Sequence, residues 1–181
     1  YNTLNIDVQA GLTTEKALLD SLLLEIERQV AVSSEIAKYK NDNAHVLALT
    51  IETVQITDRS YVEIAIVAYE NLSSDASTNL TSEKALLDSL FIEIKRLEAV
   101  ASEITLFKVD NASALSITVD SAVISDKVIV EAALAAYDAL SNDAKLGLLS
   151  EKTLLDSFLT EIERKEAVVL EISTFMSNHF V

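Results

Sequence analysis

The chain has 181 residues, of which 50% are hydrophobic and 24% are charged, and its net charge is −15. This hydrophobicity excludes an intrinsically disordered chain, and an acidic surface without a Lys/Arg cluster argues against nucleic acid and anionic membranes as partners. The absence of cysteine excludes disulfides and thiolate metal sites.

A block of sequence recurs three times at a fixed interval. It reads TTEKALLDSLLLEIER from Thr13, TSEKALLDSLFIEIKR from Thr81 and LSEKTLLDSFLTEIER from Leu149, so that 81 − 13 and 149 − 81 both give 68. Such a period is typical of tandem arrays in which each unit packs on its neighbours. It divides the chain into a partial repeat unit, residues 1–45, and two full units, residues 46–113 and 114–181.

The first predicted element is a short helix at residues 5–11, repeated at 73–79 and 141–147. It begins with residues that can cap the free amides of a first turn, Asn5, Ser73 and Ser141. An aspartate follows where the helix dipole favours an anion, at Asp7, Asp75 and Asp143. It ends at Gly11, Asn79 and Gly147, residue types that tolerate a left-handed backbone, and we expect positive φ there.

A long helix comes next. We expect it to begin with a side-chain cap at Thr14, Ser82 or Ser150 and to end near Asp42-Asn43 and Asp110-Asn111. About 26 helical residues would span roughly 40 Å. In the middle copy the apolar positions are Leu86, Leu87, Leu90, Ile94, Leu97, Val100, Ile104 and Phe107. Charged residues such as Glu25, Glu27 and Arg28 form its predicted exposed side.

Two connectors, residues 46–57 and 114–125, have an ambiguous pattern. Leu115, Ile117 and Val119 alternate in a way that is typical of a strand. A short helical turn followed by an extended segment is the preferred interpretation, and pairing as small strands is the alternative.

The last helix of the unit has one apolar face. In the third copy that face comprises Val130, Ala133, Leu134, Tyr137 and Leu140, at spacings of three and four. Ser125 or Asp126 is the expected cap. Tyr1 holds the same position as Tyr69 and Tyr137, inside this helix, so we expect the natural chain to extend further upstream.

These elements predict an all-α fold in which three-helix units stack as an elongated rod with short extended connectors. A 68-residue unit buries only about 60% of its unfolded surface when alone, which favours stacking. No apolar run approaches the roughly 18 residues of a membrane span.

No residue set predicts catalysis, a cofactor or a metal. Asp20-Ser21, Asp88-Ser89 and Asp156-Ser157 resemble acid–nucleophile pairs, but adjacent helical residues point about 100° apart and no histidine stands near as a base. His45 and His179 lack the spacing of a zinc helix motif. Asn71, Asn79 and Asn111 begin glycosylation sequons, whose use depends on the source of the protein.

Apolar residues also lie beside the predicted core seam of the long helix. Leu23, Phe91 and Leu159 adjoin Leu22, Leu90 and Phe158. Exposed patches of this kind commonly mark interfaces, so we expect each unit to present one and the chain to self-associate.

The stretch from Ile124 to Phe158 resembles a repeat of large surface proteins of Gram-positive bacteria. Asp126-Lys127, Val130-Glu131-Ala132-Ala133 and the run from Ala136 to Ser141 carry the resemblance, although the proline often found before the family's helix is absent. The resemblance implies an extracellular, cell-surface or cell-wall location and repeats that serve as spacers or adhesive modules, without catalytic residues.

The leading hypothesis is therefore a non-catalytic structural segment of a bacterial surface stalk, fibre or surface layer. The alternative is an adhesin-type module that captures a host or neighbouring-cell protein through exposed helix faces. Exposed positions such as Gln9, Ser77 and Lys145 differ between copies, which favours the structural role.

Overall fold

The structure is a computed structural model that describes residues 2–179. In this part of the chain all regular elements are helices and there is no strand, which confirms the predicted all-α class. The chain divides into two compact units, Tyr1–Lys95 and Arg96–Val181, and the division falls inside helix α6. Tyr1, which the sequence places in a helix, lies outside the described residues.

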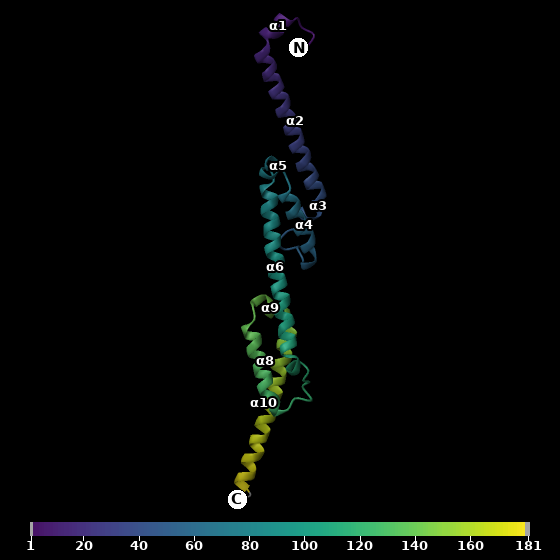
Figure 1. Ribbon diagram of the computed structural model, residues 1–181. Coiled ribbons are helices and arrows are strands. Elements are labelled where there is room, and N and C mark those ends of the chain that lie inside the picture. The colour runs from purple at the N-terminus through teal and green to yellow at the C-terminus, as the bar shows by residue number, and fades with distance from the viewer. Residues whose placement is uncertain (1, 180–181) are drawn as a thin grey trace. The chain divides into compact units, whose positions relative to one another are not determined.

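Unit 1 packs the second half of one long helix against a shorter helix and the start of the next long one (Figure 1). Its elements are α1 (Ile6–Gly11), α2 (Thr13–Asp42), α3 (Ala44–Leu47), η1 (Ile56–Asp58), α4 (Arg59–Glu70), α5 (Ser74–Thr78) and the first part of α6 (Thr81–Asp110). Its core comprises Tyr39, Val46, Val54, Val62, Ala65, Leu80, Leu87, Leu90 and Ile94.

Unit 2 has the same order of elements. It consists of the rest of α6, α7 (Ala112–Leu115), η2 (Ile124–Asp126), α8 (Lys127–Ala139), α9 (Asn142–Gly147) and α10 (Leu149–His179). Its core comprises Phe107, Ala114, Ala122, Val130, Ala133, Tyr137, Leu148, Leu155, Phe158 and Ile162. Each core includes an edge-to-face aromatic contact with ring centroids 6.2 Å apart, between Tyr39 and the adjoining Tyr69 in unit 1 and between Phe107 and Tyr137 in unit 2.

The connectors begin with a helical turn and do not pair as strands. Helix α7 is followed by a turn in which the backbone N–H of Thr118 donates to Oγ of Ser121, at 2.9 Å. This turn interrupts the alternating pattern and delivers Ala122 into the core, fully buried. Thr50 and Thr53 make the equivalent turn in unit 1. Side-chain to backbone bonding of this kind competes with strand pairing.

The predicted caps of the short helices are confirmed. Asn5, Ser73 and Ser141 each accept a hydrogen bond from a first-turn backbone N–H. Asp7, Asp75 and Asp143 lie in these first turns, as expected.

The predicted left-handed ends of these helices are wrong. No described residue has positive φ. Gly11 and Gly147 are the last residues of α1 and α9, and the chain turns at the following leucines, Leu12 (φ −113°) and Leu148 (φ −122°). Each leucine N–H donates to the carbonyl three residues earlier, so one tight turn joins the short helix to the long one.

Other predicted caps are also wrong. Thr14, Ser82 and Ser150 lie inside α2, α6 and α10, because each of these helices begins one residue earlier, and α2 has no side-chain cap. Before α8, the Asp126 carboxylate accepts from the backbone N–H of Val123, at 2.9 Å, and does not cap the helix. The predicted ends at Asp42 and Asp110 are confirmed.

Candidate functional site

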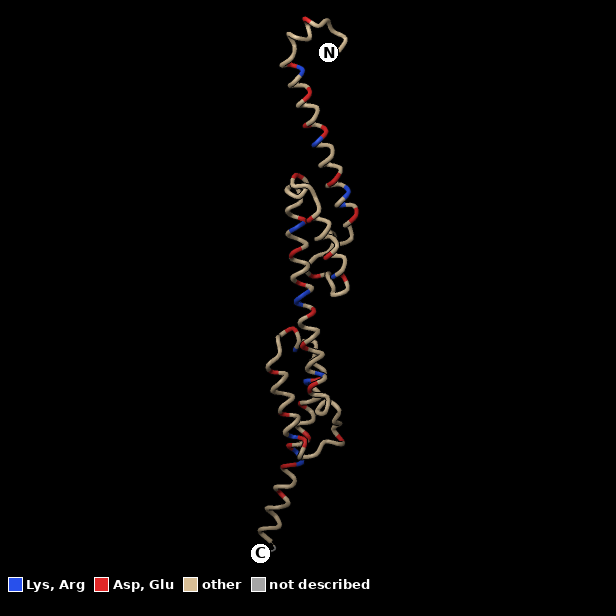
Figure 2. Tube along the Cα trace, viewed as in Figure 1, with Lys and Arg blue, Asp and Glu red and all other residues tan. Residues whose placement is uncertain are grey.

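The most regular feature of both units is a set of three polar contacts between a long helix and the elements that follow it. Figure 2 shows Lys and Arg interspersed with Asp and Glu along these helices. In the first contact, Arg28 pairs with Asp75 in unit 1, and Arg96 pairs with Asp143 in unit 2. Arg28 also binds Glu25 on its own helix, and this hydrogen bond lowers the pKa of Glu25 to about 2.

The second contact holds the cap of the short helix. Glu35 accepts from both the backbone N–H (2.8 Å) and the hydroxyl (2.6 Å) of Ser73. Glu103 accepts from the backbone N–H of Ser141 at 3.1 Å. These hydrogen bonds, led by the one from the serine side chain, lower the pKa of both glutamates below the ordinary 4.5. The carboxylate therefore anchors the N-terminus of the short helix to the long helix.

The third contact joins consecutive long helices within a unit. Lys40 pairs with Glu83 and Lys108 pairs with Glu151, both at 2.7 Å. The hydrogen bond from the lysine lowers the pKa of each glutamate, against a smaller opposing effect of partial burial. All three contacts recur at positions 68 residues apart.

Sequence reasoning did not anticipate these contacts. It placed Arg28 on the exposed side of a long helix and Asp75 in the first turn of a short helix. Each of these positions is correct, but the contact between the two residues was not predicted. The available signal was that both members of the pair recur, as Arg96 and Asp143, with the same separation of 47 residues (75 − 28 and 143 − 96).

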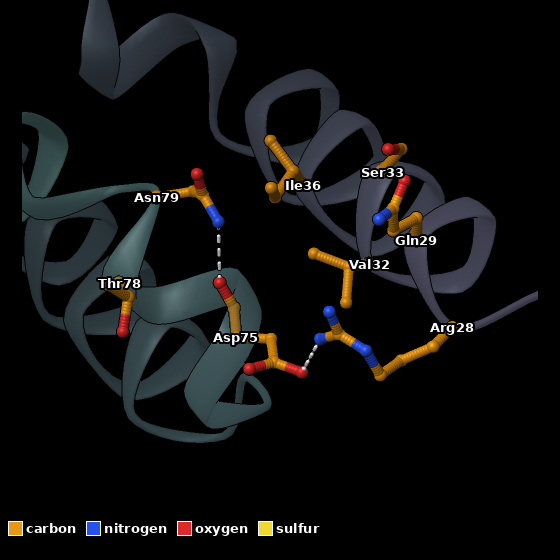
Figure 3. A pocket seen from close by; sticks show the side chains of 8 residues that line it. All are labelled: Arg28, Gln29, Val32, Ser33, Ile36, Asp75, Thr78 and Asn79. Carbon is orange, nitrogen blue, oxygen red and sulfur yellow. Dashed lines mark hydrogen bonds and ion pairs between the residues drawn. The ribbon is translucent and has the colours of Figure 1, made fainter. Parts of the chain in front are cut away.

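A recess of about 380 Å³ adjoins the first contact in unit 1 (Figure 3). It is lined by Arg28, Gln29, Val32, Ser33, Ile36, Asp75, Thr78 and Asn79. At the equivalent positions of unit 2, Leu97, Ala101, Leu146 and Gly147 replace the four neutral polar residues. The arginine–aspartate pair is therefore common to both units, whereas the polar lining belongs to unit 1 alone.

The three Asp-Ser pairs lie on helix surfaces, as predicted. Asp20, Asp88 and Asp156 are exposed and pair with the lysine four residues earlier. Ser21, Ser89 and Ser157 each donate to a backbone carbonyl of the preceding turn. The carboxylate and the hydroxyl thus engage different partners.

The two histidines are surface residues with aromatic neighbours. His45 lies edge-on to Tyr61, at 5.9 Å between ring centroids, and His179 stacks on Phe175 at 4.3 Å. Within residues 2–179 there is no group of three or more His, Cys, Asp or Glu side chains placed to hold a metal ion.

The asparagines of the three glycosylation sequons lie at the ends of helices. The side-chain amides of Asn71, Asn79 and Asn111 each donate to the carbonyl oxygen four residues earlier, at 2.8–2.9 Å. Asn43 does the same to Tyr39. Asparagine at these positions therefore has a structural role, since its side chain binds a carbonyl of the last helical turn.

The positions expected to form an exposed apolar patch in each unit are wrong for two of the three copies. Leu90 and Phe158 are fully buried, and Phe91 and Leu159 pack against the cores. Only α2 exposes these positions, where Leu22 is 50% and Leu23 56% exposed. The shorter helices α4 and α8 bring in the buried residues that cover the equivalent positions in the other copies.

Comparison with protein families, curated proteins and solved structures finds no match to this chain. None of the helices formed by the described residues is both long and apolar enough to cross a membrane.

Proposed function

We propose that this chain is a non-catalytic structural repeat segment of a bacterial surface stalk, fibre or surface-layer protein. In this proposal its 68-residue three-helix units stack as an elongated rod and associate with one another. The observation that carries it is the recurrence of the same three polar contacts 68 residues apart. An array made of like units accounts for such recurrence, since each unit folds through the same internal contacts.

The state of the chemically versatile side chains supports a non-catalytic role. Glu35 and Glu103 hold helix caps, and the serines of the three Asp-Ser pairs bond backbone carbonyls. A catalytic centre is normally one asymmetric constellation with a base within reach of its nucleophile. The polar contacts described above recur in both units, so they do not form a single asymmetric centre of this kind.

The extracellular location rests on the resemblance of residues 124–158 to Gram-positive surface repeats. The acidic excess is compatible with it, because a large net charge keeps an exposed array soluble.

An adhesin-type module is the second candidate. The recess beside Arg28 favours it, because its polar lining in unit 1 is replaced by apolar residues in unit 2, so that one unit carries a surface the other lacks. Specific, saturable binding of the purified chain to host or neighbouring cells, abolished by Gln29→Leu with Ser33→Ala, would favour this second role.

The structural proposal is tested on cells of the source organism. An antibody raised against the purified chain should label intact cells along surface stalks or fibres in electron microscopy. A matched antibody against a cytosolic enzyme should label only permeabilised cells. Labelling by both antibodies only after permeabilisation would contradict the proposed location.

A further inference from the structure

Each unit contains a short helix that contributes very little apolar surface to the interior. Helix α5 buries a single residue, Ala76, and α9 buries a single residue, Ala144. Neither alanine belongs to the core cluster of its unit. Helices this short are not stable in isolation, so contacts with the rest of the unit must hold them in place. The same arrangement occurs in both units and is therefore a property of the repeat.

The chain is anchored on both sides of each short helix. In unit 2, Leu140 packs against the core and Leu148 is fully buried in it, and the equivalent leucines of unit 1 do the same. We call residues 73–79 and 141–147 the straps, because each is a short segment fixed at both ends. No residue of either strap belongs to a core cluster. A strap can therefore leave its place without removing any residue from a core.

Polar contacts hold the straps against the long helices. Two of them are the arginine–aspartate pair, Arg96 with Asp143 in unit 2, and the carboxylate–cap contact of Glu103 with Ser141. Figure 3 shows the equivalent arginine–aspartate pair between α2 and α5 in unit 1. The side chains of Arg96 and Asp143 are 45% and 53% exposed, and ion pairs in such surroundings contribute little to stability.

A tyrosine of the preceding helix supplies a further contact with each strap. The hydroxyl of Tyr137 on α8 donates to the backbone carbonyl of Lys145, at 3.1 Å. The hydroxyl of Tyr69 on α4 donates to the backbone carbonyl of Ser77, at 2.8 Å. The ring of Tyr137 belongs to one core and that of Tyr69 packs against the other, so each hydroxyl joins a core to its strap.

We propose that the two straps open and close as local units while both cores stay folded, and that the tyrosine, arginine and glutamate contacts are latches that keep them closed. A few polar groups set this balance, so it responds to ionic strength and to the loss of single groups. Opening of α9 uncovers part of the long helix, because Cδ1 of Ile104 lies 2.6 Å from where a Cβ of Gly147 would be. This motion lies within each unit and does not depend on the proposed surface role, which cell labelling tests separately.

Native-state hydrogen exchange of the full chain near neutral pH tests local opening. The reporters are the backbone amides of Ser77 and Lys145, which donate to carbonyls within the straps at 2.9 and 3.0 Å. The helical amides of the fully buried Ala65 and Ala133 are the reference for the cores. The strap amides should be about 100-fold or more less protected, and dilute urea should speed exchange of the core amides only. Strap and core amides with protection within about threefold of each other would overturn local opening.

Tyr137→Phe and Tyr69→Phe form a matched pair that tests the tyrosine latches. Each variant keeps its aromatic ring and removes one hydrogen bond from one strap. Tyr137→Phe should speed exchange at Lys145 about threefold to tenfold and leave Ser77 within about twofold of wild type, and Tyr69→Phe should have the converse effect. Variants that change both straps equally, or neither, would overturn this assignment.

Tyr39→Phe is the control for loss of a tyrosine hydroxyl elsewhere. The hydroxyl of Tyr39 donates to the carbonyl of Ala65 inside unit 1, at 3.2 Å, and contacts neither strap. This variant should speed exchange of the core amides of unit 1 and leave the amide of Ser77 unchanged. Faster exchange at Ser77 in Tyr39→Phe, by as much as in Tyr69→Phe, would show that the strap opens only with its core and would overturn the proposal.

Salt tests the charged latches. Raising sodium chloride from about 0.1 M to about 1 M shortens the screening length from about 10 Å to about 3 Å, so both strap amides should exchange about twofold or more faster after correction for intrinsic rates. In Asp143→Asn, Lys145 should already exchange faster at low salt and should lose most of this response, whereas Ser77 keeps it. Equal salt responses of Lys145 and Ser77 in Asp143→Asn would overturn the arginine–aspartate pair as a latch.

Discussion

Gly147 leaves space beside α9 for the end of the Ile104 side chain on α6. The residue is the last of α9, and a Cβ there would lie 2.6 Å from Cδ1 of Ile104 on α6. A Cβ at this position would require the end of the Ile104 side chain to move. In unit 1 the equivalent residue is Asn79, whose side chain donates to the carbonyl of Asp75. The two units thus have different residues at this position, with different neighbouring contacts.

Gly147→Ala and Gly11→Ala form a matched pair of substitutions. Alanine is favoured over glycine in a helix by up to about 1 kcal/mol, and Gly11 should show this gain because its surroundings are open. Gly147→Ala should be less favourable than Gly11→Ala by about 0.5 kcal/mol or more, since the end of the Ile104 side chain must move. Urea unfolding at low micromolar concentration measures both.

Ile104→Val provides the control because valine lacks Cδ1. In the Ile104→Val background, Gly147→Ala should recover most of the lost stability, giving a coupling energy of about 0.5 kcal/mol or more. Equal effects of the two glycine substitutions, without coupling to Ile104, would show that the close approach has no energetic weight.

At the scale of elements, short helices are held to long ones by carboxylates. Glu103 accepts from the cap residue of α9, and Glu35 does the same for α5. The hydrogen bonds from the serine stabilise the charged form of each carboxylate. They therefore lower the pKa of Glu35 and of Glu103. A lowered folded pKa contributes stability above the unfolded value of about 4.5, and this contribution is lost as pH falls through the folded pKa.

Glu103→Gln should therefore destabilise the protein at pH 7 and have a diminishing effect as pH falls below about 4.5. Urea midpoints at pH 7, pH 5, pH 4 and pH 3 measure this, with wild type as reference. Glu70→Gln, at an exposed site on α4, removes the same charge and is the control. If the two variants had parallel pH profiles, the carboxylate–cap contact would not contribute.

Helix periodicity and the caps of the short helices were predictable from the sequence, because both depend on residues close to one another in the chain. The long helices end at Asp42 and Asp110 as expected, and Ser73 and Ser141 cap as expected. The role of Gly147 was not predictable, because glycine was interpreted as a local requirement for positive φ. The atom nearest to a Cβ at this position belongs to Ile104, which lies 43 residues earlier (147 − 104).

The candidate site was less predictable than the fold. Asp143 looks like an ordinary dipole-complementing residue, and only its pairing with Arg96 shows that it joins two helices. Exposed apolar residues on the long helix were also misjudged, because spacing gave the packing face of α8 but not which side of α10 that face covers.

At the scale of the whole molecule, the packed bodies and the sequence repeats have the same 68-residue period but different starting points. The core of unit 1 and its partly buried neighbours run from Ile36 to Ile94, and those of unit 2 from Ile104 to Ile162, so equivalent ends are again 68 residues apart (104 − 36 and 162 − 94). The predicted divisions after residues 45 and 113 fall inside these stretches. A periodic sequence gives the same period from any starting point, so it cannot say where one packed body ends.

This offset between repeat and packing is the physical basis of the proposed rod. A long helix that gives one part to one core and another part to the next would link successive units through continuous backbone, and α6 supplies Leu90 to the first core and Phe107 to the second. Stability in such an array is a sum of unit and nearest-neighbour terms.

Small-angle X-ray scattering, extrapolated to zero concentration, tests the proposed linear array most directly. Two 30-residue helices placed end to end span about 90 Å, and a thin rod of that length has a radius of gyration of about 26 Å. The account predicts this value or a larger one for the monomer. A radius near 16 Å, which is about the value for a compact globule of this length, would contradict it.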